Sequence, residues 1–584
     1  MTAIDAEPPA TPTPIAESPE VAPAKPPRGR FLGTLLYGRN VDRTAKARAR
    51  VGLAILAFAA VYSIVAARLV MFAVAPESHF VRRGASKDAI ATARPDILDR
   101  NGMILATDVR APSLFAEPRK IIDVDESIEL LTAVLPDLDP TEVRDRIGSR
   151  KGFVWLKREI TPKQRQEIYK LGLPGVGFLA ENKRVYPNSA EVSHLIGHVN
   201  IDNQGIAGIE KWLDGHSLQA LHLAGLATDR LQKPVELAVD LRVQHALRDE
   251  LIFAAEKYKV KAAAGLVVDV ETGEIVSMVS LPDYDPNSPK QANDPLRINR
   301  LTTGVFELGS TFKALTLAMA FDSGKINLNS SFDARGALHY GRFTIHDYHP
   351  QNRVLTVPEI FTYSSNIGTA KIALALGVEH HKWFLKKMGQ LDRLRTELPE
   401  SAEPIVPKRW GELNTVTIAF GHGLSVAPLQ AVMGVAATLN GGLLIPPTFL
   451  KRSREEALGL AKQVLKPETS QKMRYLMRLN AEKGSGSSAN VRGYYVGGKT
   501  GTAEKVINGR YSKTKLLTDF MAVLPADKPR YLILIMLDEP QPTPETHGYA
   551  TAGWNAGPTA AKVDRKSTRL NSSHLKLSRM PSSA

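Results

Sequence analysis

The stretch Phe306–Ala320, FELGSTFKALTLAMA, places a serine directly after a glycine, at the start of an apolar run with helical spacing. Ser310 opens this predicted helix, and Lys313 lies three residues later, so both side chains point to one face. A hydroxyl is a weak nucleophile at neutral pH and needs an adjacent base. A lysine can be that base when burial or nearby cations lower its pKa. The stretch therefore predicts a serine nucleophile paired with a lysine.

Two further motifs follow in a fixed order. The spacing Ser-x-x-Lys occurs three times in the chain, but only the copy at Ser310 opens a helix after a glycine. Ser364-Ser365-Asn366 comes just ahead of a second helical run, and Lys499-Thr500-Gly501-Thr502 lies in a strand-like stretch. The order S-x-x-K, S-x-N and K-T-G is the signature of penicillin-recognising acyl-serine enzymes.

An uncharged apolar run near the N-terminus predicts a membrane anchor. Residues 51–67 carry no charge over 17 positions, and four basic residues stand at 43–50. A helix of about 20 apolar residues spans a bilayer, and preceding positive charge keeps the N-terminus in the cytoplasm. A signal peptide or a buried helix fits less well, because the run begins late and lacks a cleavage pattern. We therefore expect a transmembrane helix at 51–75, preceded by a disordered, proline-rich and basic tail at 1–50.

The composition of the 584 residues excludes several classes of function. The chain has no cysteine, which excludes a thiol nucleophile, a thiolate zinc site and an iron–sulfur cluster. A net charge of +15 suggests an anionic partner. Because most of the chain is expected outside the cytoplasm, nucleic acid is not that partner. Residues 564–584, DRKSTRLNSSHLKLSRMPSSA, contribute +4 and resemble a translated sequencing adapter, so we interpret them as a non-native tail.

Between the anchor and this tail, the pattern predicts two folded domains. Over 76–234, short apolar runs alternate with turn signals such as Asn101-Gly102, which is typical of a hairpin. From 235 onward, a helical stretch precedes two strands within Ala262–Leu281, and further strands are predicted at 495–506 and 531–537. This order favours an α+β domain at 235–563 with a mainly antiparallel sheet.

With these motifs in place, the chain resembles the class B penicillin-binding proteins, most of all their division-specific septal peptidoglycan transpeptidases. The resemblance implies an elongated, β-rich pedestal at 76–234 followed by a transpeptidase domain at 235–563. It also implies a single-pass protein of the bacterial inner membrane with a periplasmic catalytic domain and no cofactor or metal. Matching segments outside the active site are Arg94–Ala106, Arg184–Pro187, His194–Val199, Gly205–Glu210, Asn299–Phe306 and Gly421–Ser425.

The resemblance implies a catalytic role for four residues. Ser310 attacks the carbonyl of the penultimate D-alanine of a stem peptide and releases the last D-alanine. Lys313 takes the proton of the serine. Ser364 and Lys499 pass a proton to the leaving amine. An amine of a neighbouring strand then attacks the acyl-enzyme, and β-lactams acylate the same serine.

The remaining motif positions are implied to bind the substrate. Asn366 orients the lysine base and binds a substrate amide, while Thr500, Gly501 and Thr502 form the site of the substrate carboxylate. The implied partners are stem peptides ending in D-Ala-D-Ala, β-lactams, a lipid II polymerase and other division proteins in the membrane.

Several alternatives remain beside this interpretation. A class A β-lactamase needs a water-activating glutamate four residues before the asparagine of a Glu-Leu-Asn stretch, and Trp410 occupies that slot before Asn414. We therefore expect slow deacylation by water. An elongation-specific class B transpeptidase shares every active-site motif, and a non-catalytic division scaffold with a vestigial site also remains open. Three histidines at 339–349 favour a polar surface loop over a metal site, and His422 favours a structural role.

Overall fold

The computed structural model divides the chain into two units, Met1–Ser86 and Lys87–Ala584, and each is described by itself. The proline-rich segment at 1–42 and the last fourteen positions of the predicted non-native tail lie outside the described residues. The described residues are 43–74, 93–149, 151–215, 233–341, 343–491 and 493–570.

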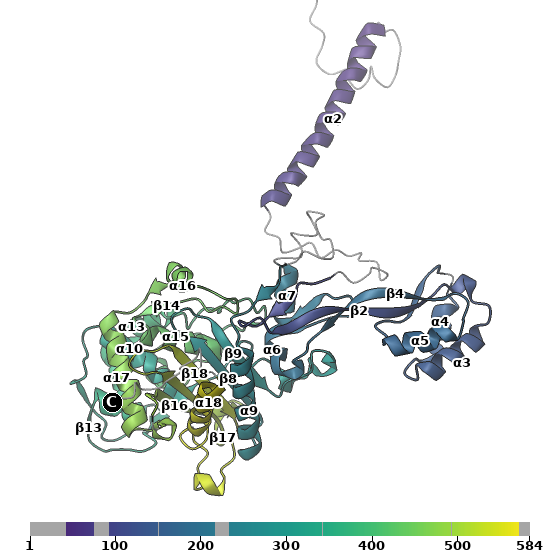
Figure 1. The fold of residues 1–584 in the computed structure, drawn as a ribbon. Helices are drawn as coiled ribbons and strands as arrows, with labels where there is room; N and C mark the ends of the chain where they lie inside the picture. The colour runs from purple at the N-terminus through teal and green to yellow at the C-terminus, as the bar shows by residue number, and fades with distance from the viewer. Residues whose placement is uncertain are drawn as a thin grey trace, which may run out of the picture. The chain divides into compact units, whose positions relative to one another are not determined.

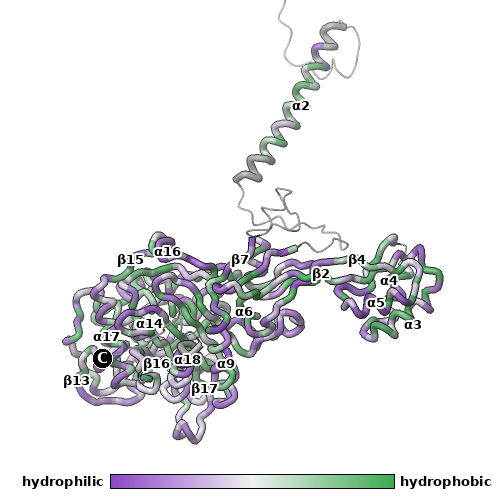
Figure 2. Tube along the Cα trace, viewed as in Figure 1, coloured by the Kyte–Doolittle hydropathy of each residue, from purple (hydrophilic) through white to green (hydrophobic). Residues whose placement is uncertain are grey.

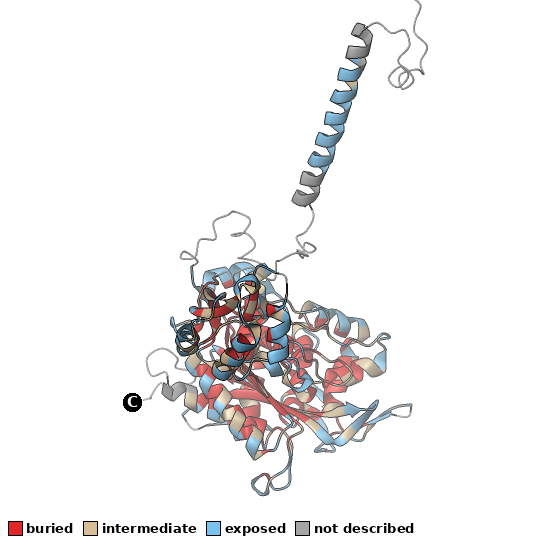
Figure 3. Ribbon diagram, turned by 90° about the vertical axis from the view of Figure 1, so that its right-hand side faces the viewer, coloured by how far each residue is buried: buried red, intermediate tan, exposed pale blue. Residues whose placement is uncertain are grey.

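The first unit contains the helix α2 (Arg43–Val74), which is 32 residues long. Its segment Arg50–Ala67 is exposed along its length, and among the described residues α2 is the one helix long and apolar enough to cross a membrane. Figure 2 shows the apolar character of this helix, and Figure 3 its exposure. The helix begins eight residues before the predicted start at 51, so the basic residues at 43–50 belong to its first turns rather than to the tail.

An antiparallel five-stranded sheet forms the centre of the larger domain, in the order β16-β17-β18-β8-β9 (Figure 1). The predicted α+β architecture is confirmed. The sequence analysis did not predict β17, which carries the second Ser-x-x-Lys spacing at Ser512 and Lys515. The strands are β8 (Ala262–Asp269), β9 (Ile275–Leu281), β16 (Gly497–Ile507), β17 (Arg510–Leu524) and β18 (Tyr531–Asp538).

Both faces of this sheet are covered, and Figure 3 shows its strands as buried. Alternate residues of a strand point to opposite faces: Ile533 and Ile535 of β18 join one hydrophobic core, and Leu532 and Leu534 join the other. The helices α9 (Leu241–Lys257) and α18 (Ala556–Leu570) cover the first face, and α10 (Lys313–Asp322), α15 (Pro428–Leu439) and α17 (Pro467–Lys483) lie on the second.

The last helix, α18, continues past the boundary predicted at 563. It runs to Leu570, Asp564 is buried within it, and Lys566 forms ion pairs with Asp249 and Glu250 of α9. The assignment of 564–584 as a non-native tail stays a prediction.

The remaining elements of this domain surround the second face. Three short strand pairs, β10 with β13, β11 with β12, and β14 with β15, lie outside the central sheet. Helices α11 (Val357–Thr362), α12 (Asn366–Leu376), α13 (Val378–Lys387), α14 (Glu412–Ala419) and α16 (Arg454–Leu460) complete it. The strands are β10 (Ser331–Asp333), β11 (Leu338–Tyr340), β12 (Phe343–Ile345), β13 (Val354–Thr356), β14 (Leu443–Leu444) and β15 (Lys462–Gln463).

The pedestal combines a second five-stranded sheet with helices, so it is mixed rather than simply β-rich. The predicted hairpin at Asn101-Gly102 is present, because β1 pairs antiparallel with β2 across that turn. A small core joins β2, β3 and β4 to α3, α4 and α5. The strands are β1 (Ile97–Leu98), β2 (Ile104–Ala116), β3 (Val154–Lys157), β4 (Val176–Val185) and β7 (Val235–Glu236), and the helices are α3 (Val124–Val134), α4 (Pro140–Ile147) and α5 (Pro162–Lys170).

A buried ionic cluster ties the pedestal strands to the short helix α7 (Gly208–Leu213). The Nε atoms of Arg94 and Arg184 each donate to one oxygen of Glu210, at 2.8 and 2.7 Å, and all three side chains are buried. Removing one partner of such a cluster would leave a buried charge uncompensated. Three of the matching segments found in the sequence, those of Arg94, Arg184 and Glu210, therefore have a structural role.

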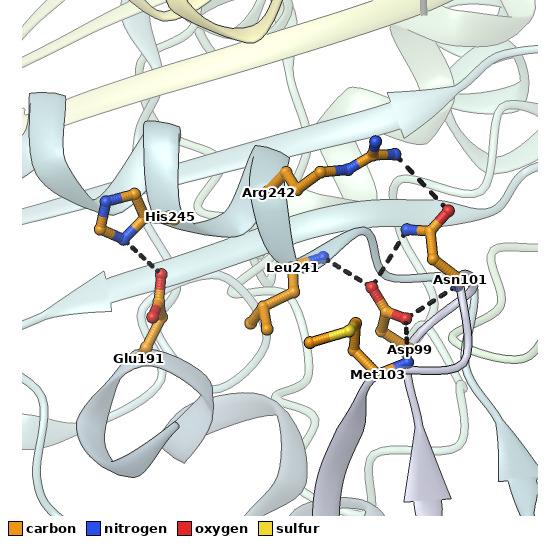
Figure 4. A pocket seen from close by; sticks show the side chains of 7 residues that line it. All are labelled: Asp99, Asn101, Met103, Glu191, Leu241, Arg242 and His245. Atoms are coloured by element: carbon orange, nitrogen blue, oxygen red, sulfur yellow. Dashed lines mark hydrogen bonds and ion pairs between the residues drawn. The ribbon is translucent and has the colours of Figure 1, made fainter. Parts of the chain in front are cut away.

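A cavity of about 580 Å³ lies where the pedestal hairpin meets α9 (Figure 4). Leu241 N donates to Asp99 Oδ2 across it (3.1 Å), and His245 Nδ1 lies 3.0 Å from Glu191 Oε1. None of its lining residues belongs to the three sequence motifs, so the cavity is separate from the candidate site. The lining residues are Asp99, Asn101, Met103, Glu191, Leu241, Arg242 and His245.

Candidate active site

Ser310 lies in a short 3-10 turn, Gly309–Phe312, that leads directly into α10. The turn is held from two sides. Gly309 N donates to Gly421 O (3.2 Å), and a Cβ at Gly309 would lie 2.7 Å from Thr502 O of β16. The serine is half-buried, and its hydroxyl has no hydrogen-bond partner among the described residues. The turn therefore presents Ser310 against the strand that carries the third motif, with its hydroxyl unengaged.

Lys313 and Lys499 meet at the hydroxyl of Ser364. Ser364 Oγ lies 3.1 Å from Lys313 Nζ and 2.9 Å from Lys499 Nζ. Lys313 Nζ also donates to Ser364 O (2.5 Å) and Asn366 Oδ1 (2.8 Å). Ser364 has a positive φ of 57°, a conformation that non-glycine residues adopt at a cost. The three motifs, far apart in sequence, thus form one hydrogen-bonded network.

Burial changes the proton affinity of both lysines. Both side chains are fully buried. Burial, with the charge of Lys499 as a second cause, holds the pKa of Lys313 well below its usual value. Burial lowers the pKa of Lys499 to about 7, and Asp519 opposes that fall. Since a lowered pKa makes an amine release its proton more readily, burial favours the neutral, basic form of Lys313 that activation of a serine requires.

The loop before the second motif has a role that the sequence analysis missed. Asp347 was interpreted as part of a polar surface loop, but it is buried. Its carboxylate accepts from Ser365 Oγ (2.7 Å) and Ile367 N (2.9 Å), and His346 O accepts from Asn366 Nδ2 (3.0 Å). Ser365 in turn caps α12. These contacts fix the Ser364–Asn366 turn at the start of the helix.

The third motif lies on β16, the edge strand of the sheet. Gly501 is required there by space, because a Cβ would lie 2.5 Å from Leu308 O and 2.3 Å from Asp519 Oδ2. Thr502 Oγ1 accepts from Ala552 N (3.2 Å), which leaves its hydroxyl proton available to a ligand. Thr500 Oγ1 lies 2.6 Å from the hydroxyl of Ser485.

Ser485 is a second neighbour that the sequence analysis missed. It belongs to the glycine- and serine-rich stretch at 484–488, which precedes β16. Its hydroxyl is hydrogen-bonded to Thr500 Oγ1 and also donates to Asn480 Oδ1 (3.3 Å). Asn480 Nδ2 in turn donates to Gly498 O (2.8 Å) at the start of β16. In the sequence, the glycine- and serine-rich stretch close to the third motif was the feature that could have pointed to Ser485.

His422, interpreted as structural, lies half-buried beside the site. Its ring is 5.4 Å from that of Phe420 and 5.6 Å from that of Tyr511. Burial lowers the pKa of His422 to about 4, so the ring is neutral near neutral pH. Tyr511 OH and Gly423 N both bond Glu307 Oε1, which joins this region to the turn of Ser310.

A serine at the start of a helix, a lysine pair joined through a second serine, and a K-T-G edge strand together define a penicillin-recognising serine acyltransferase. The chain belongs to the penicillin-binding protein transpeptidases. The model of the penicillin-binding protein transpeptidase domain matches residues 263–563, and that of the penicillin-binding protein dimerisation domain matches residues 89–215.

Similar proteins of known name align with most of the chain. A probable peptidoglycan D,D-transpeptidase FtsI of Caulobacter vibrioides is 40% identical over 494 residues, which are 82% of each chain. Peptidoglycan D,D-transpeptidase FtsI of Escherichia coli K12 is 30% identical over 77% of this chain and 80% of its own length. A crystal structure of a peptidoglycan synthetase from Bifidobacterium adolescentis shares the fold, with a TM-score of 0.64 at 24% identity, over 85% of this chain and 98% of its own.

Proposed function

We propose that the chain is a peptidoglycan D,D-transpeptidase that works through an acyl-serine intermediate on Ser310. The Ser310 oxygen attacks the carbonyl of the penultimate D-alanine while Lys313 takes its proton. The new C–O bond replaces the C–N bond to the last D-alanine, which leaves after its amine receives a proton relayed by Ser364 and Lys499. An amine of a second stem peptide then displaces the serine and forms the cross-link. Class A β-lactamase chemistry is not favoured, because the family model that matches residues 263–563 is that of the penicillin-binding protein transpeptidase domain.

The observation that carries this proposal is the position of Ser364 Oγ between the two lysine amines. One hydroxyl in contact with both gives a path along which a proton can pass from the base to the leaving group. Asn366 orients the base, and Thr500, Gly501 and Thr502 line the place of the substrate carboxylate. Backbone N–H groups of Ser310 and Thr502 form the proposed oxyanion hole.

Labelling with a fluorescent penicillin tests the nucleophile. The wild-type chain is expected to carry a covalent label that survives denaturation, because the acyl-enzyme hydrolyses slowly. Ser310→Ala is expected to carry none, since the attacking oxygen is gone, while Ser512→Ala, which alters the other Ser-x-x-Lys spacing in the folded domain, labels as wild type does. Absence of label on the wild type would leave only the vestigial scaffold, and equal label on Ser310→Ala would move the nucleophile elsewhere.

We further propose that α2 anchors the chain in the bacterial inner membrane with its N-terminus in the cytoplasm and the transpeptidase domain in the periplasm. Support comes from the exposed apolar helix and the basic residues at its start. The proposed partners are D-Ala-D-Ala stem peptides, β-lactams, and a lipid II polymerase with other division proteins in the same membrane. The proposed site of action is the division septum.

Depletion of the protein from its host separates septal from elongation roles. Loss of a septal transpeptidase is expected to block division while growth continues, so cells should become filaments. A complemented strain that expresses the wild-type chain should divide normally, and one that expresses Ser310→Ala should form filaments. Rounded cells after depletion would instead assign the chain to elongation.

A further inference from the structure

The carboxylate of Glu307, three residues before Ser310, has no part in the mechanism above, and it joins two segments that lie far apart in the sequence. Its Oε1 atom accepts a hydrogen bond from Gly423 N at 2.8 Å and another from Tyr511 OH at 3.2 Å. Its Oε2 atom is buried and has no hydrogen-bond partner in the part of the chain that the structure describes. A carboxylate oxygen can accept two hydrogen bonds, so one atom of Glu307 holds both segments.

The first of these segments is the loop at 421–426, which lies along the stretch that leads to the nucleophile. Its ends are held by backbone contacts. Phe306 N donates to Val426 O at 3.0 Å in an antiparallel bridge. Gly309 N donates to Gly421 O at 3.2 Å. The hydrogen bond to the carboxylate fixes the middle of the loop, which these two backbone contacts leave free.

The second segment is the start of β17, which carries Tyr511. This tyrosine pairs with Val506 of β16, in the same hairpin as the third motif. It is 49% exposed, and its ring centroid lies 5.6 Å from that of His422. The hydrogen bond of its hydroxyl to Glu307 therefore connects the hairpin of the third motif to the segment of the first.

We propose that Glu307 is a positioning residue, which fixes the turn of Ser310 between the loop at 421–426 and the β16–β17 hairpin. The proposed oxyanion hole combines an N–H group of Ser310 with one of Thr502, so acylation depends on the position of the turn relative to β16. Glu307 acts through the oxygen that accepts both hydrogen bonds, and its charge is not required. The reaction itself is carried out by the motif residues.

The kinetics of acylation by a fluorescent penicillin test this role, which rests on the proposed function of Ser310. The full-length chain in detergent is mixed with increasing concentrations of the penicillin. The saturation curve separates the dissociation constant of the first complex from the rate constant of acylation. Glu307→Ala removes both hydrogen bonds, Glu307→Gln keeps an acceptor oxygen without the charge, and Tyr511→Phe removes one hydrogen bond.

Glu397→Ala is the matched control, because it removes a similar pair of hydrogen bonds outside the three motifs. Glu397 is half-buried, and its carboxylate accepts from Thr448 Oγ1 at 2.6 Å and from Phe449 N at 3.0 Å. Like Glu307, it thus holds one hydroxyl and one backbone N–H. This variant should be acylated as fast as the wild type. Thermal unfolding of every variant identifies any that fails to fold.

Glu307→Ala is expected to lower the rate constant of acylation about 10²-fold, the effect of a shift of about 1 Å at a reacting group. The dissociation constant of the first complex should change by less than about threefold, because the groups that bind the penicillin remain. Glu307→Gln should stay within about threefold of the wild-type rate constant, and Tyr511→Phe should lower it about 3–10-fold. The double variant Glu307→Ala/Tyr511→Phe should be no slower than Glu307→Ala, since the tyrosine has already lost its acceptor.

Several outcomes would overturn the proposal. A wild-type rate constant in Glu307→Ala shows that the carboxylate does not position Ser310, and an equal loss in Glu397→Ala shows a general effect of lost hydrogen bonds. A Glu307→Gln variant as slow as Glu307→Ala shows that the charge is needed. If Glu307→Ala fails to fold, Tyr511→Phe carries the test, and a wild-type rate constant in that variant contradicts the proposal. A wild-type chain that is never acylated would instead overturn the proposed function, and this inference with it.

Discussion

Lys313→Met is expected to lower the rate of acylation by a β-lactam about 10²–10⁴-fold, the range that a positioned general base contributes. Lys313 is the buried amine of the first motif, and its Nζ atom makes three hydrogen bonds to residues of the second motif. Methionine fills a similar volume without a base. The serine should then be acylated only as fast as solvent can remove its proton.

The stability of the same variant separates loss of chemistry from loss of fold. Folding lowers the pKa of Lys313, so the folded protein binds the proton less well than the unfolded chain does. This lysine therefore opposes folding at any pH below its unfolded pKa near 10.5. The penalty grows as the pH falls, and it becomes constant once the pH lies below the folded pKa. Methionine removes that penalty together with the hydrogen bonds, so the free energy of unfolding should not fall by more than about 1 kcal/mol.

The control for Lys313→Met is Lys371→Met on α12. Lys371 is a half-buried lysine that donates to Asp333 O at 2.6 Å, outside the site. Acylation rates come from stopped reactions with a fluorescent penicillin, and stability from denaturant unfolding. If Lys313→Met were acylated as fast as Lys371→Met, another group would have to be the base, and Lys499 would be the first to test.

The motif residues could be predicted from sequence because the chemistry depends on local spacing. Ser310 and Lys313 lie within one turn, and Asn366 opens a helix whose apolar run is visible in the sequence. The antiparallel sheet was predicted for the same reason, since β8 and β18 are nearly continuous apolar runs. The local geometry of the site could thus be predicted from the sequence. The catalytic and binding roles of its residues stay predictions.

What could not be predicted depends on contacts between distant segments. Asp347 looks like any polar loop residue until the fold places it under Ser365. Asp519 is notable only because the register sets it opposite Gly501. The strand β17 begins with the polar stretch at 510–515, which carries no apolar pattern, and pairing with β16 extends the strand through it. In each case a partner far away in sequence supplies the stabilisation that the local sequence lacks.

The loop that faces Ser310 gives the second large expected effect. Gly421→Ala is expected to lower acylation by about 10²-fold or more. Gly421 has a φ of 91°, and a Cβ there would lie 2.0 Å from Gly309 O, one residue before the nucleophile. Because that atom belongs to the backbone, the alanine can be accommodated only if the loop or the turn of Ser310 moves. A displacement of about 1 Å at a reacting group can reduce the rate by about 10²-fold.

Gly441→Ala is the matched control, because it isolates the strain of the backbone from the collision. Gly441 has a φ of 94°, and a Cβ there would meet no atom within 4 Å. Both alanines should lose about 1–2 kcal/mol of stability from the left-handed backbone. Gly421→Ala should lose about 1–3 kcal/mol more from overpacking, and it alone should lose acylation. Denaturant unfolding and fluorescent-penicillin rates, measured on both variants, distinguish the effects: wild-type acylation in Gly421→Ala would mean that the loop yields without moving Ser310.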